Sequence, residues 1–571
     1  MRSAQWLLLS VIAAFLFVCG WGCGTSNGGT TTAPSALTYT TAAAVYTTGT
    51  PITADSPTNS GGAVSSYSVS PALPAGLSLS TSTGVISGTP TTATAMATYT
   101  VTASNSIGST TEALSITVNA APLSAANVNL IFVVSEDSAN TTGDVNPDTA
   151  NLTNRGLQRS LLMAPFLKQN VLGGKNVTAI YALEPMTHLQ DATKGTYPDM
   201  VPLAIIQPFA MLNQITLADG NQNFTANSYP ILASYSADSI PAGVAPESFP
   251  CAACQGLDFK DQQGDNEALV GGIVSSNIPG FYVFSAPWET VSALMANMNQ
   301  LRGYNLTLPA GYAGPNYVYA ISIPPKGSAS LVTFNSNLNP LLTYPVLPPP
   351  ALTSAACPTA NSVPALFNIQ VTASNGTIPL DINKNETVYM IRHAEAHPTD
   401  WFEDGNYVAA GEWRALDLPN ALRGKIHPTQ IYSIDPAVGF PAGAGRSNGS
   451  YIRPSLTVEP YAIANGLPYN LAASVAVFSQ NGPLSPLASD FFFTKGTFSN
   501  QTLLVAWEHE HIPPTINALL TTYNSRQVAP NWPDYDTIWT VTLDSVGNLT
   551  VNNALCEGID SATLPKTAPP F

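Results

Sequence analysis

The chain has 571 residues, which is too long for one domain, so about three or four domains are expected. Hydrophobic residues make up 45% of the chain and charged residues only 9%, which excludes a disordered polypeptide and indicates a folded protein containing β-structure. The net charge of -16 at pH 7 argues against nucleic acid or an anionic lipid surface as the main partner.

The first residues predict export. An apolar run at 6–18 is shorter than a membrane-spanning helix and typical of a signal peptide. Cys23 follows it, and this order resembles a bacterial lipoprotein signal, in which the cysteine becomes the lipidated first residue. Gly20 stands where that pattern prefers Leu, so simple cleavage or an uncleaved anchor are the alternatives. We expect a signal peptide at 1–23, a flexible linker at 24–36, and a periplasmic or cell-surface protein, lipid-anchored or else secreted.

The exported part has an even number of further cysteines, which favours disulfides outside the cytoplasm: Cys251, Cys254, Cys357 and Cys556. For Cys251 and Cys254 we favour a local bridge over a redox pair, because nothing around them resembles a thioredoxin unit. A disulfide between Cys357 and Cys556 would link the two ends of the last domain. No second pair of Cys or His makes a zinc site, so neither a metal nor another cofactor is expected.

Residues 37–121 read as short alternating strands separated by turn signals, which predicts an all-β sandwich. Within them, residues 73–90 read LPAGLSLSTSTGVISGTP. This stretch resembles the immunoglobulin-like, cadherin-like modules of bacterial surface proteins. The resemblance implies a spacer, or else a module that contacts carbohydrate or protein at the cell surface.

The rest of the chain is predicted to be a tandem duplication, with similar units at 125–343 and 365–571 and a Pro-rich linker at 344–364. Four segments recur in the same order in both units. The pairs are 129–137 with 387–395, 156–161 with 411–416, 180–185 with 431–436, and 317–334 with 536–551. Each unit reads as alternating strands and helices with a closing hairpin, which predicts a mainly parallel sheet covered on both faces. The expected fold class is therefore α/β, with two tandem three-layer α/β/α domains behind a small all-β sandwich.

In the second unit, polar residues follow apolar strands. Residues 388–395 read VYMIRHAE, so Arg392 and His393 stand at the carboxyl end of a buried strand, where α/β sheets bind ligands. Arg453 lies near a predicted helix start, and His509 follows a third apolar strand. A guanidinium offers an oxyanion a planar fork, and an imidazole can attack as a nucleophile or transfer a proton. We expect these groups to converge on one anion.

The first unit lacks this polar cluster. Val134 and Ser135 stand at the positions of Arg392 and His393, and Val201 stands where the second unit has its second arginine. The first unit is therefore predicted to keep the fold and to have lost the reaction.

These motifs resemble those of the histidine phosphatase superfamily, the phosphoglycerate-mutase-like and acid-phosphatase fold. RHA at 392–394 stands where the family has Arg-His-Gly, RPSLT at 453–457 matches its second Arg followed by Thr, and EH at 508–509 matches its second His. The resemblance covers 386–551, and Ala394 departs from the family's usual Gly. The first unit resembles the fold but departs at every one of these positions.

The resemblance implies that His393 attacks phosphorus and becomes a phosphohistidine. Arg392, Arg453 and His509 would bind the phosphoryl oxygens and neutralise charge in the transition state. Water would then release phosphate, with no metal or other cofactor.

The general acid stays open, because branches of the family place it differently. Glu510, directly after the second His, is the favoured candidate, and Asp490 in a loop is the other. Arg446 is a nearby rival of Arg453, and His511 is a rival of His509 as phosphate ligand.

Three further polar residues of the second unit are assigned no catalytic role. His397 and His427 are expected to be exposed, and Glu395 is expected either to be solvated or to orient a catalytic group.

The leading hypothesis is an exported phosphomonoesterase that acts on a phosphorylated small molecule. The alternative is a cell-surface protein that binds phosphorylated or anionic ligands on a phosphatase-like scaffold without turnover. Mutase activity ranks third, because an exported enzyme rarely meets phosphorylated glycolytic intermediates. A complete set of two arginines and two histidines favours catalysis over binding alone.

Overall fold

The computed structural model describes residues 32–135, 151–191, 195–196, 198–219, 222–235, 254–259, 261, 264–347, 357, 365–397, 404–437, 449–471 and 485–571. The predicted signal peptide with Cys23, the rival Arg446, Cys251 and most of the predicted linker at 344–364 lie outside these ranges. No helix in the described part of the chain is long and apolar enough to cross a membrane.

The N-terminal module is an all-β sandwich. Its strands are β1 (Pro34–Tyr39), β2 (Ala43–Thr47), β3 (Pro57–Gly61), β4 (Ser66–Ser70), β5 (Leu77–Leu79), β6 (Ile86–Gly88), β7 (Thr94–Ser104) and β8 (Ser109–Asn119). The main sheet has the order β2-β8-β7-β4, and β1-β3 and β5-β6 form two smaller sheets around buried side chains such as Tyr39, Val101 and Ile116. The first strand starts at Pro34, so the predicted boundary at 37 was three residues late.

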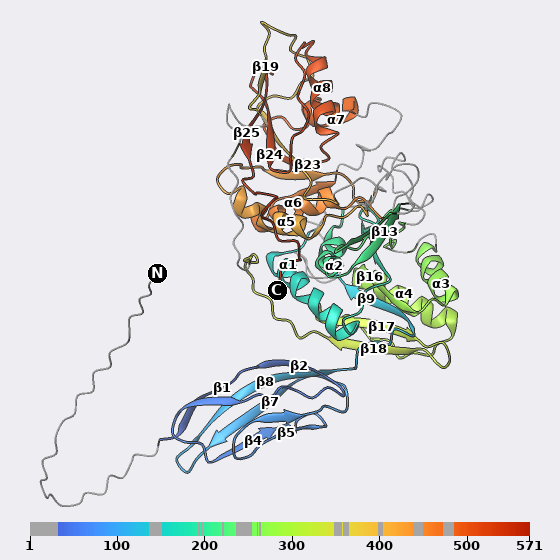
Figure 1. Ribbon diagram of the computed structural model, residues 1–571, viewed down its shortest axis with the longest axis vertical. Coiled ribbons are helices and arrows are strands. Elements are labelled where there is room, and N and C mark those ends of the chain that lie inside the picture. The colour runs from blue at the N-terminus through green and yellow to red at the C-terminus, as the bar shows by residue number, and fades with distance from the viewer. Residues whose placement is uncertain are drawn as a thin grey trace, which may run out of the picture.

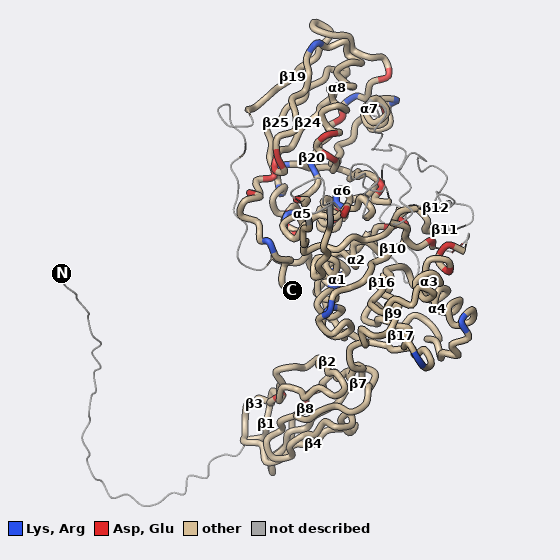
Figure 2. The backbone as a smooth tube through the Cα atoms, turned by 45° about the vertical axis from the view of Figure 1, so that its right-hand side comes forward, with Lys and Arg blue, Asp and Glu red and all other residues tan. Residues whose placement is uncertain are grey.

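The sandwich docks on the first α/β unit through paired amides. Asn119 Nδ2 donates to the Asn335 carbonyl at 2.9 Å, and Asn335 N donates to Asn119 Oδ1 at 2.7 Å. Figure 2 shows the sandwich almost entirely without charged residues. Its surface therefore offers polar, uncharged side chains.

The first α/β unit is built on a six-stranded sheet of order β15-β10-β16-β9-β17-β18. Its elements are β9 (Val128–Val134), α1 (Asn154–Phe166), the π-helical turn η2 (Leu167–Val171), β10 (Ala179–Ala182), β11 (Leu189–Asp191), β12 (Gly195–Thr196), α2 (Val201–Met211), β13 (Ile215–Asp219), β14 (Gln222–Ala226), β15 (Ile231–Leu232), α3 (Asp265–Ser276), β16 (Gly280–Ala286), α4 (Trp288–Arg302), β17 (Tyr317–Ile323) and β18 (Ser330–Asn335). The strands β15, β10, β16 and β9 are parallel, and β17 and β18 run antiparallel to them.

The second unit repeats this order and adds one edge strand, as β22-β21-β23-β20-β24-β25-β19. Its elements are β19 (Asn368–Val371), β20 (Glu386–Arg392), α5 (Ala409–Ala421), β21 (Gln430–Ser433), α6 (Arg453–Asn465), β22 (Tyr469–Leu471), α7 (Ser485–Phe493), β23 (Thr502–Trp507), α8 (Ile512–Thr522), β24 (Thr537–Leu543) and β25 (Leu549–Cys556). Parallel and antiparallel pairings fall at the same places as in the first unit.

The strand registers match the two units residue by residue. In β9, Val134 pairs with Ala286, and in β20, Arg392 pairs with Trp507. The next residue donates the same backbone hydrogen bond in each unit, from Ser135 N at 3.1 Å and from His393 N at 2.9 Å. All four predicted segment pairs therefore fall on equivalent elements.

The two units face each other through α1 and α2 of the first and α5 and α6 of the second (Figure 1). Leu157 and Ala204 pack here against Leu416 and Ile463. Buried apolar residues of both units join one continuous core. Tyr344, at the start of the predicted linker, donates its hydroxyl to the Leu416 carbonyl at 2.8 Å.

Candidate active site

The site lies where β20 and β23 end side by side. Both strands run in the same direction, and their register places Arg392 opposite Trp507. The residues that follow, His393 and Glu508, are therefore neighbours at the carboxyl edge of the sheet. β24 is antiparallel to β20, so the chain just before β24 reaches this same edge and brings Tyr535 to it.

His393 is fully buried and presents one free nitrogen. Its Nδ1 lies 2.7 Å from the Ala394 carbonyl, which can only accept, so the proton is on Nδ1 and the lone pair is on Nε2. Burial, helped by the positive charges of Arg453 and Arg392, lowers the pKa of His393 to about 3. The imidazole is therefore neutral near pH 7, the form that can act as a nucleophile.

The loop after His393 is tied to the helix that carries the second arginine. Thr457 Oγ1 accepts a hydrogen bond from Ala394 N at 2.8 Å and donates one to the Arg453 carbonyl at 2.7 Å. One threonine therefore joins the Arg-His-Ala loop to the first turn of α6. The Ala394 methyl is fully buried in the continuous core.

The start of α6 depends on a close backbone approach. Gly405 has φ +76°, and a Cβ there would lie 2.0 Å from the Ser450 carbonyl oxygen. The Gly405 carbonyl accepts hydrogen bonds from Ile452 N at 3.0 Å and Arg453 N at 3.1 Å. Only glycine fits this contact, and the contact places Arg453 at the first residue of the helix.

Each arginine of the site lies over a tyrosine ring. Arg392 Cζ is 3.9 Å from the centroid of Tyr535, and Arg453 Cζ is 4.9 Å from that of Tyr451. The same rings flank His393, with centroids 6.0 and 6.2 Å from the imidazole. Among the described residues, no carboxylate forms an ion pair with Arg392. Its guanidinium is thus held in place by stacking and is available to an anion.

Glu508 is the centre of a group of imidazoles. Its Oε1 lies 3.6 Å from His393 Nε2 and accepts a hydrogen bond from His509 Nδ1, and its Oε2 lies 3.7 Å from His511 Nδ1. Burial by itself raises a carboxyl pKa, but hydrogen bonding by neighbouring imidazoles such as that of His509 outweighs it and lowers the pKa of Glu508 well below its usual range. Glu508 is therefore ionised in the free protein.

The structure places Arg392, Arg453 and His509 near His393. The coordinating atoms of His393, Glu508 and His509 all lie within 4.8 Å of one another. His509 is about one-third exposed, so it lies on the solvent side of this group. His511, its rival, stacks on the Trp507 ring with centroids 6.4 Å apart.

The two general-acid candidates occupy different places. Glu510 is exposed at the strand end beside the site, and its backbone N donates to Glu508 Oε2. Asp490 lies on α7, one turn before Phe493, whose carbonyl accepts from Asn383 N at 2.8 Å. Because Asn383 precedes the first residue of β20, Asp490 lies toward the opposite edge of the sheet from His393.

Of the two histidines expected to be exposed, one is buried. His397 is buried, with Nε2 3.3 Å from Asp404 Oδ1, and was expected to be exposed. The reason is non-local, because Phe224 of the first unit packs its ring edge-on against His397, with centroids 5.5 Å apart. His427 is exposed, as expected.

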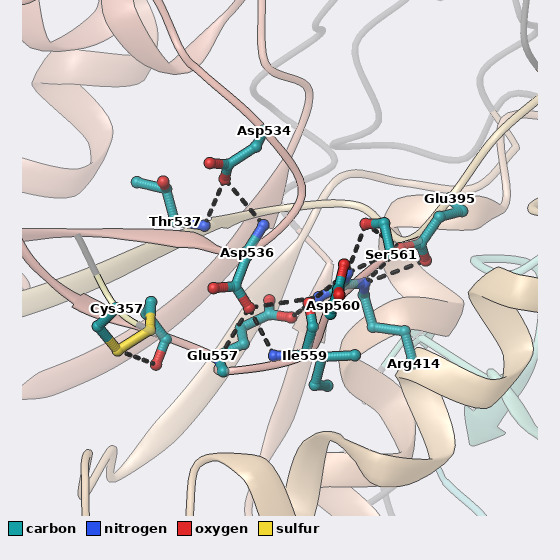
Figure 3. A network of polar contacts seen from close by, with 12 residues as sticks. Cys357, Glu395, Arg414, Asp534, Asp536, Thr537, Glu557, Ile559, Asp560 and Ser561 are labelled. Atoms are coloured by element: carbon teal, nitrogen blue, oxygen red, sulfur yellow. Dashed lines mark hydrogen bonds and ion pairs between the residues drawn. A yellow bond between two sulfur atoms is a disulfide. The ribbon is translucent and has the colours of Figure 1, made fainter. Parts of the chain in front are cut away.

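Glu395 is buried in an ion pair with Arg414, and it is not solvated (Figure 3). Arg414 Nη2 is 2.7 Å from Glu395 Oε1, and Nη1 donates to Glu557. Glu557 follows Cys556, whose predicted disulfide with Cys357 is present with Cα atoms 5.3 Å apart. A buried guanidinium thus connects the loop after His393 to the disulfide-linked end of the sheet. Cys254 is also disulfide-bonded.

The first unit supports the loops around the site. Ser228 Oγ donates to Asp404 Oδ2 at 2.7 Å, and the side-chain amides of Gln207 and Asn406 exchange two hydrogen bonds of 2.8 and 3.0 Å. Ser450, next to Tyr451, accepts from Ala233 N at 2.8 Å. The segment before Arg453 is therefore fixed by contacts with the first unit.

A cavity of about 410 Å³ lies elsewhere, at the ends of α5 and α6. It is lined by residues such as Asn420, His427 and Asn465, and none of the predicted catalytic residues lines it. These residues precede β21 and β22, so the cavity opens at the amino edge of the parallel strands.

Sequence reasoning missed two members of the site. The sequence pattern assigns no role of its own to Glu508, although this residue directly follows a strand parallel to β20. It gives no signal at Tyr535, whose position depends on the antiparallel direction of β24. Strand direction is the signal that could have found both residues. The carboxyl ends of parallel strands and the amino end of a strand antiparallel to them lie at the same edge of a sheet.

Comparison with known proteins identifies the N-terminal module. The family model described as Putative Ig domain matches residues 29–119, which agrees with the predicted immunoglobulin-like module and the observed β-sandwich. No curated protein matches the chain.

Three solved structures show partial likeness. Two are Bacteroides fragilis proteins described as alpha-galactosidases, each 15% identical with a TM-score of 0.13, covering 46% and 44% of this chain. The chain spans about half the length of both, at 55% and 54%. The third is described as the phosphohistidine phosphatase SixA from Nakamurella multipartitia, 14% identical over 32% of this chain and 92% of that one, with a TM-score of 0.18. At these scores none of the three establishes a shared fold.

Proposed function

We propose that the chain is a phosphomonoesterase whose second α/β unit works through a phosphohistidine on His393. One observation carries this proposal: a buried, neutral imidazole with its lone pair on Nε2 lies beside two arginines at a sheet edge. A nucleophile that is already deprotonated needs no separate base. Guanidinium groups match the equatorial oxygens of a phosphoryl group in transfer.

In the proposed reaction, His393 Nε2 forms a bond to phosphorus while the ester P–O bond breaks and the leaving oxygen takes a proton. Arg392 and Arg453 bind the phosphoryl oxygens, and His509 neutralises charge from the solvent side. Water then attacks phosphorus and gives a proton to the carboxylate that had protonated the leaving oxygen, the N–P bond breaks and phosphate leaves. Thr457 keeps the two halves of this anion site in fixed relation through its hydrogen bonds.

Glu510 is proposed as the proton donor to the leaving group, and Glu508 as the residue that holds the imidazoles. The reason is ionisation, since the pKa of Glu508 is lowered and an ionised carboxylate has no proton to give. A Glu510→Gln variant should lose turnover of an alkyl phosphate, whose leaving group needs protonation, and keep turnover of p-nitrophenyl phosphate. Equal losses on both substrates would exclude this role.

The proposal includes export with lipidation of Cys23 and a phosphorylated small molecule as substrate. The sparse charge of the chain and the apolar run before Cys23 support it. Mass spectrometry of the mature protein from a bacterial envelope tests the lipid, because a diacylglycerol on an N-terminal cysteine adds a defined mass. An unmodified mature N-terminus would leave simple secretion.

Turnover of p-nitrophenyl phosphate by the purified exported part tests the reaction. We expect activity that persists in EDTA, is inhibited by vanadate and is lost in a His393→Ala variant. A stable phosphoenzyme trapped with acid-labile, base-stable phosphate would identify the intermediate as a phosphohistidine. Activity that survives in the variant would overturn the proposal, and binding of phosphate without turnover would favour the ligand-binding alternative.

A further inference from the structure

Three atoms of the proposed phosphatase site lie close enough together to hold one metal ion. They come from His393, Glu508 and His509 and lie within 4.8 Å of one another. Neighbouring ligands of a tetrahedral Zn²⁺ are about 3.3 Å apart, because each metal–nitrogen or metal–oxygen bond is about 2.0–2.2 Å long. His393 Nε2 and Glu508 Oε1 are 3.6 Å apart, so only small side-chain movements would bring the three atoms around one ion.

The protonation of these groups already suits a metal. The Nδ1–H of His393 is directed to the Ala394 carbonyl, the second-shell contact typical of a metal-bound histidine, and its Nε2 carries the lone pair. Glu508 is held close to three imidazoles and supplies a negative charge. His509 needs only to transfer its ring proton from Nδ1 to Nε2, or to turn its ring, to offer a lone pair.

The donor set selects the kind of metal. Two imidazoles with one carboxylate are a zinc-binding combination that leaves a fourth position open, whereas Mg²⁺ prefers oxygen ligands throughout. Arg392 and Arg453 repel a lone cation, which weakens the site, but they also hold an anion next to the open position. A metal ion and a phosphate or other oxyanion are therefore expected to bind together.

We propose that the site takes one Zn²⁺ on His393, Glu508 and His509, and that the ion inhibits phosphoryl transfer. Inhibition follows because the ion occupies the Nε2 lone pair with which His393 attacks phosphorus. The binding part of this proposal stands on the three side chains alone, and the inhibitory part rests on the proposed function.

Calorimetric titration of the chelator-treated exported part with ZnCl₂, with and without inorganic phosphate, tests the binding. We expect one Zn²⁺ per chain, tighter binding when phosphate is present, and no comparable binding of Mg²⁺. Glu508→Gln and His509→Ala should each weaken Zn²⁺ binding at least about 10-fold. His427→Ala is the matched control, because His427 is exposed and lies away from the three ligands, and it should bind Zn²⁺ as the wild type does.

Circular dichroism of each variant separates loss of a ligand from loss of the fold. Unchanged Zn²⁺ affinity in the folded Glu508→Gln and His509→Ala proteins would overturn the site, as would equal binding of Mg²⁺. Turnover of p-nitrophenyl phosphate, measured in EDTA and then in excess Zn²⁺, tests inhibition. Zinc binding without any turnover in EDTA would refute the phosphatase and leave the metal site standing, and full turnover with zinc bound would refute the inhibition.

Discussion

The two α/β units share a scaffold and differ in the groups placed on it. Ser135 and His393 donate equivalent backbone hydrogen bonds at equivalent strand ends, and Val201 and Arg453 are each the first residue of an equivalent helix. A polar side chain such as that of His393 or Arg453 is therefore not needed to form this strand end or this helix. The comparison separates the residues that build the sheet from those that give it chemistry.

A second pair of positions shows what both units retain. Arg159 and Arg414 are buried on equivalent helices, and they contact Asn316 and Asp536, which occupy equivalent positions just before β17 and β24. A buried arginine that joins helix to sheet thus belongs to the framework. In the second unit this arginine contacts Glu395, in the loop that follows His393.

The largest effect is expected when the second unit is given the residue of the first. Arg453→Val copies Val201, so the helix start tolerates the side chain and the protein should remain folded. Turnover of p-nitrophenyl phosphate should fall about 10²- to 10³-fold, because one donor to the phosphoryl oxygens is lost. Steady-state kinetics with a thermal unfolding control measures this. A variant that keeps at least half of the wild-type kcat/KM would show that the two helix starts do not differ in function.

The next largest effect is expected for Arg414→Met, which should lower the free energy of unfolding by about 3–5 kcal/mol, because the buried acidic groups of Glu395 and Glu557 lose their cation. Urea unfolding of the exported part measures the change. Arg423→Met, at an exposed residue just after the end of α5, serves as control. If Arg414→Met were as stable as the control, the buried arginine that both units share would not stabilise the fold.

A smaller effect is expected at the interface of the two units. Glu412 stands where the first unit has Leu157, and burial raises the pKa of Glu412 to about 8. Between about pH 4.5 and 8 the unfolded chain has lost this proton and the folded chain has kept it, so stability falls as pH rises. Glu412→Gln should therefore raise the Tm by a few degrees at pH 8 and leave it nearly unchanged at pH 4.5. A pH-independent shift would contradict the assigned ionisation.

The smallest effect concerns pH and activity. An ordinary histidine nucleophile would lose activity as it becomes protonated near pH 6.5, whereas the pKa of His393 is about 3 in the free protein. The ratio kcat/KM reports the ionisation of the free enzyme. After correction for ionisation of the substrate phosphate, we expect protonation of His393 to cause no fall in kcat/KM between pH 7 and 5. If kcat/KM instead fell below about pH 6.5, and still did so when each other histidine was substituted, His393 would have its ordinary pKa.

Much of the fold and part of the site could be predicted along the chain. Apolar runs that end in polar residues located β20 and β23, and repeated segments located the equivalent elements of the first unit. The same patterns did not predict that Glu508 lies beside His393, since that depends on the register between two strands. They also misplaced His397, whose burial depends on Phe224 in the other unit.

The sequence by itself determined the candidate site residues of the second unit and the scaffold positions that recur in the first unit, because strand and helix periodicity and the order of motifs are local properties of the chain. Only the tertiary structure decided the protonation of His393, the partners of Glu395 and the gathering of three possible metal ligands. These depend on burial and on charges from distant segments, and burial is a property of packed surfaces that no single stretch of chain contains.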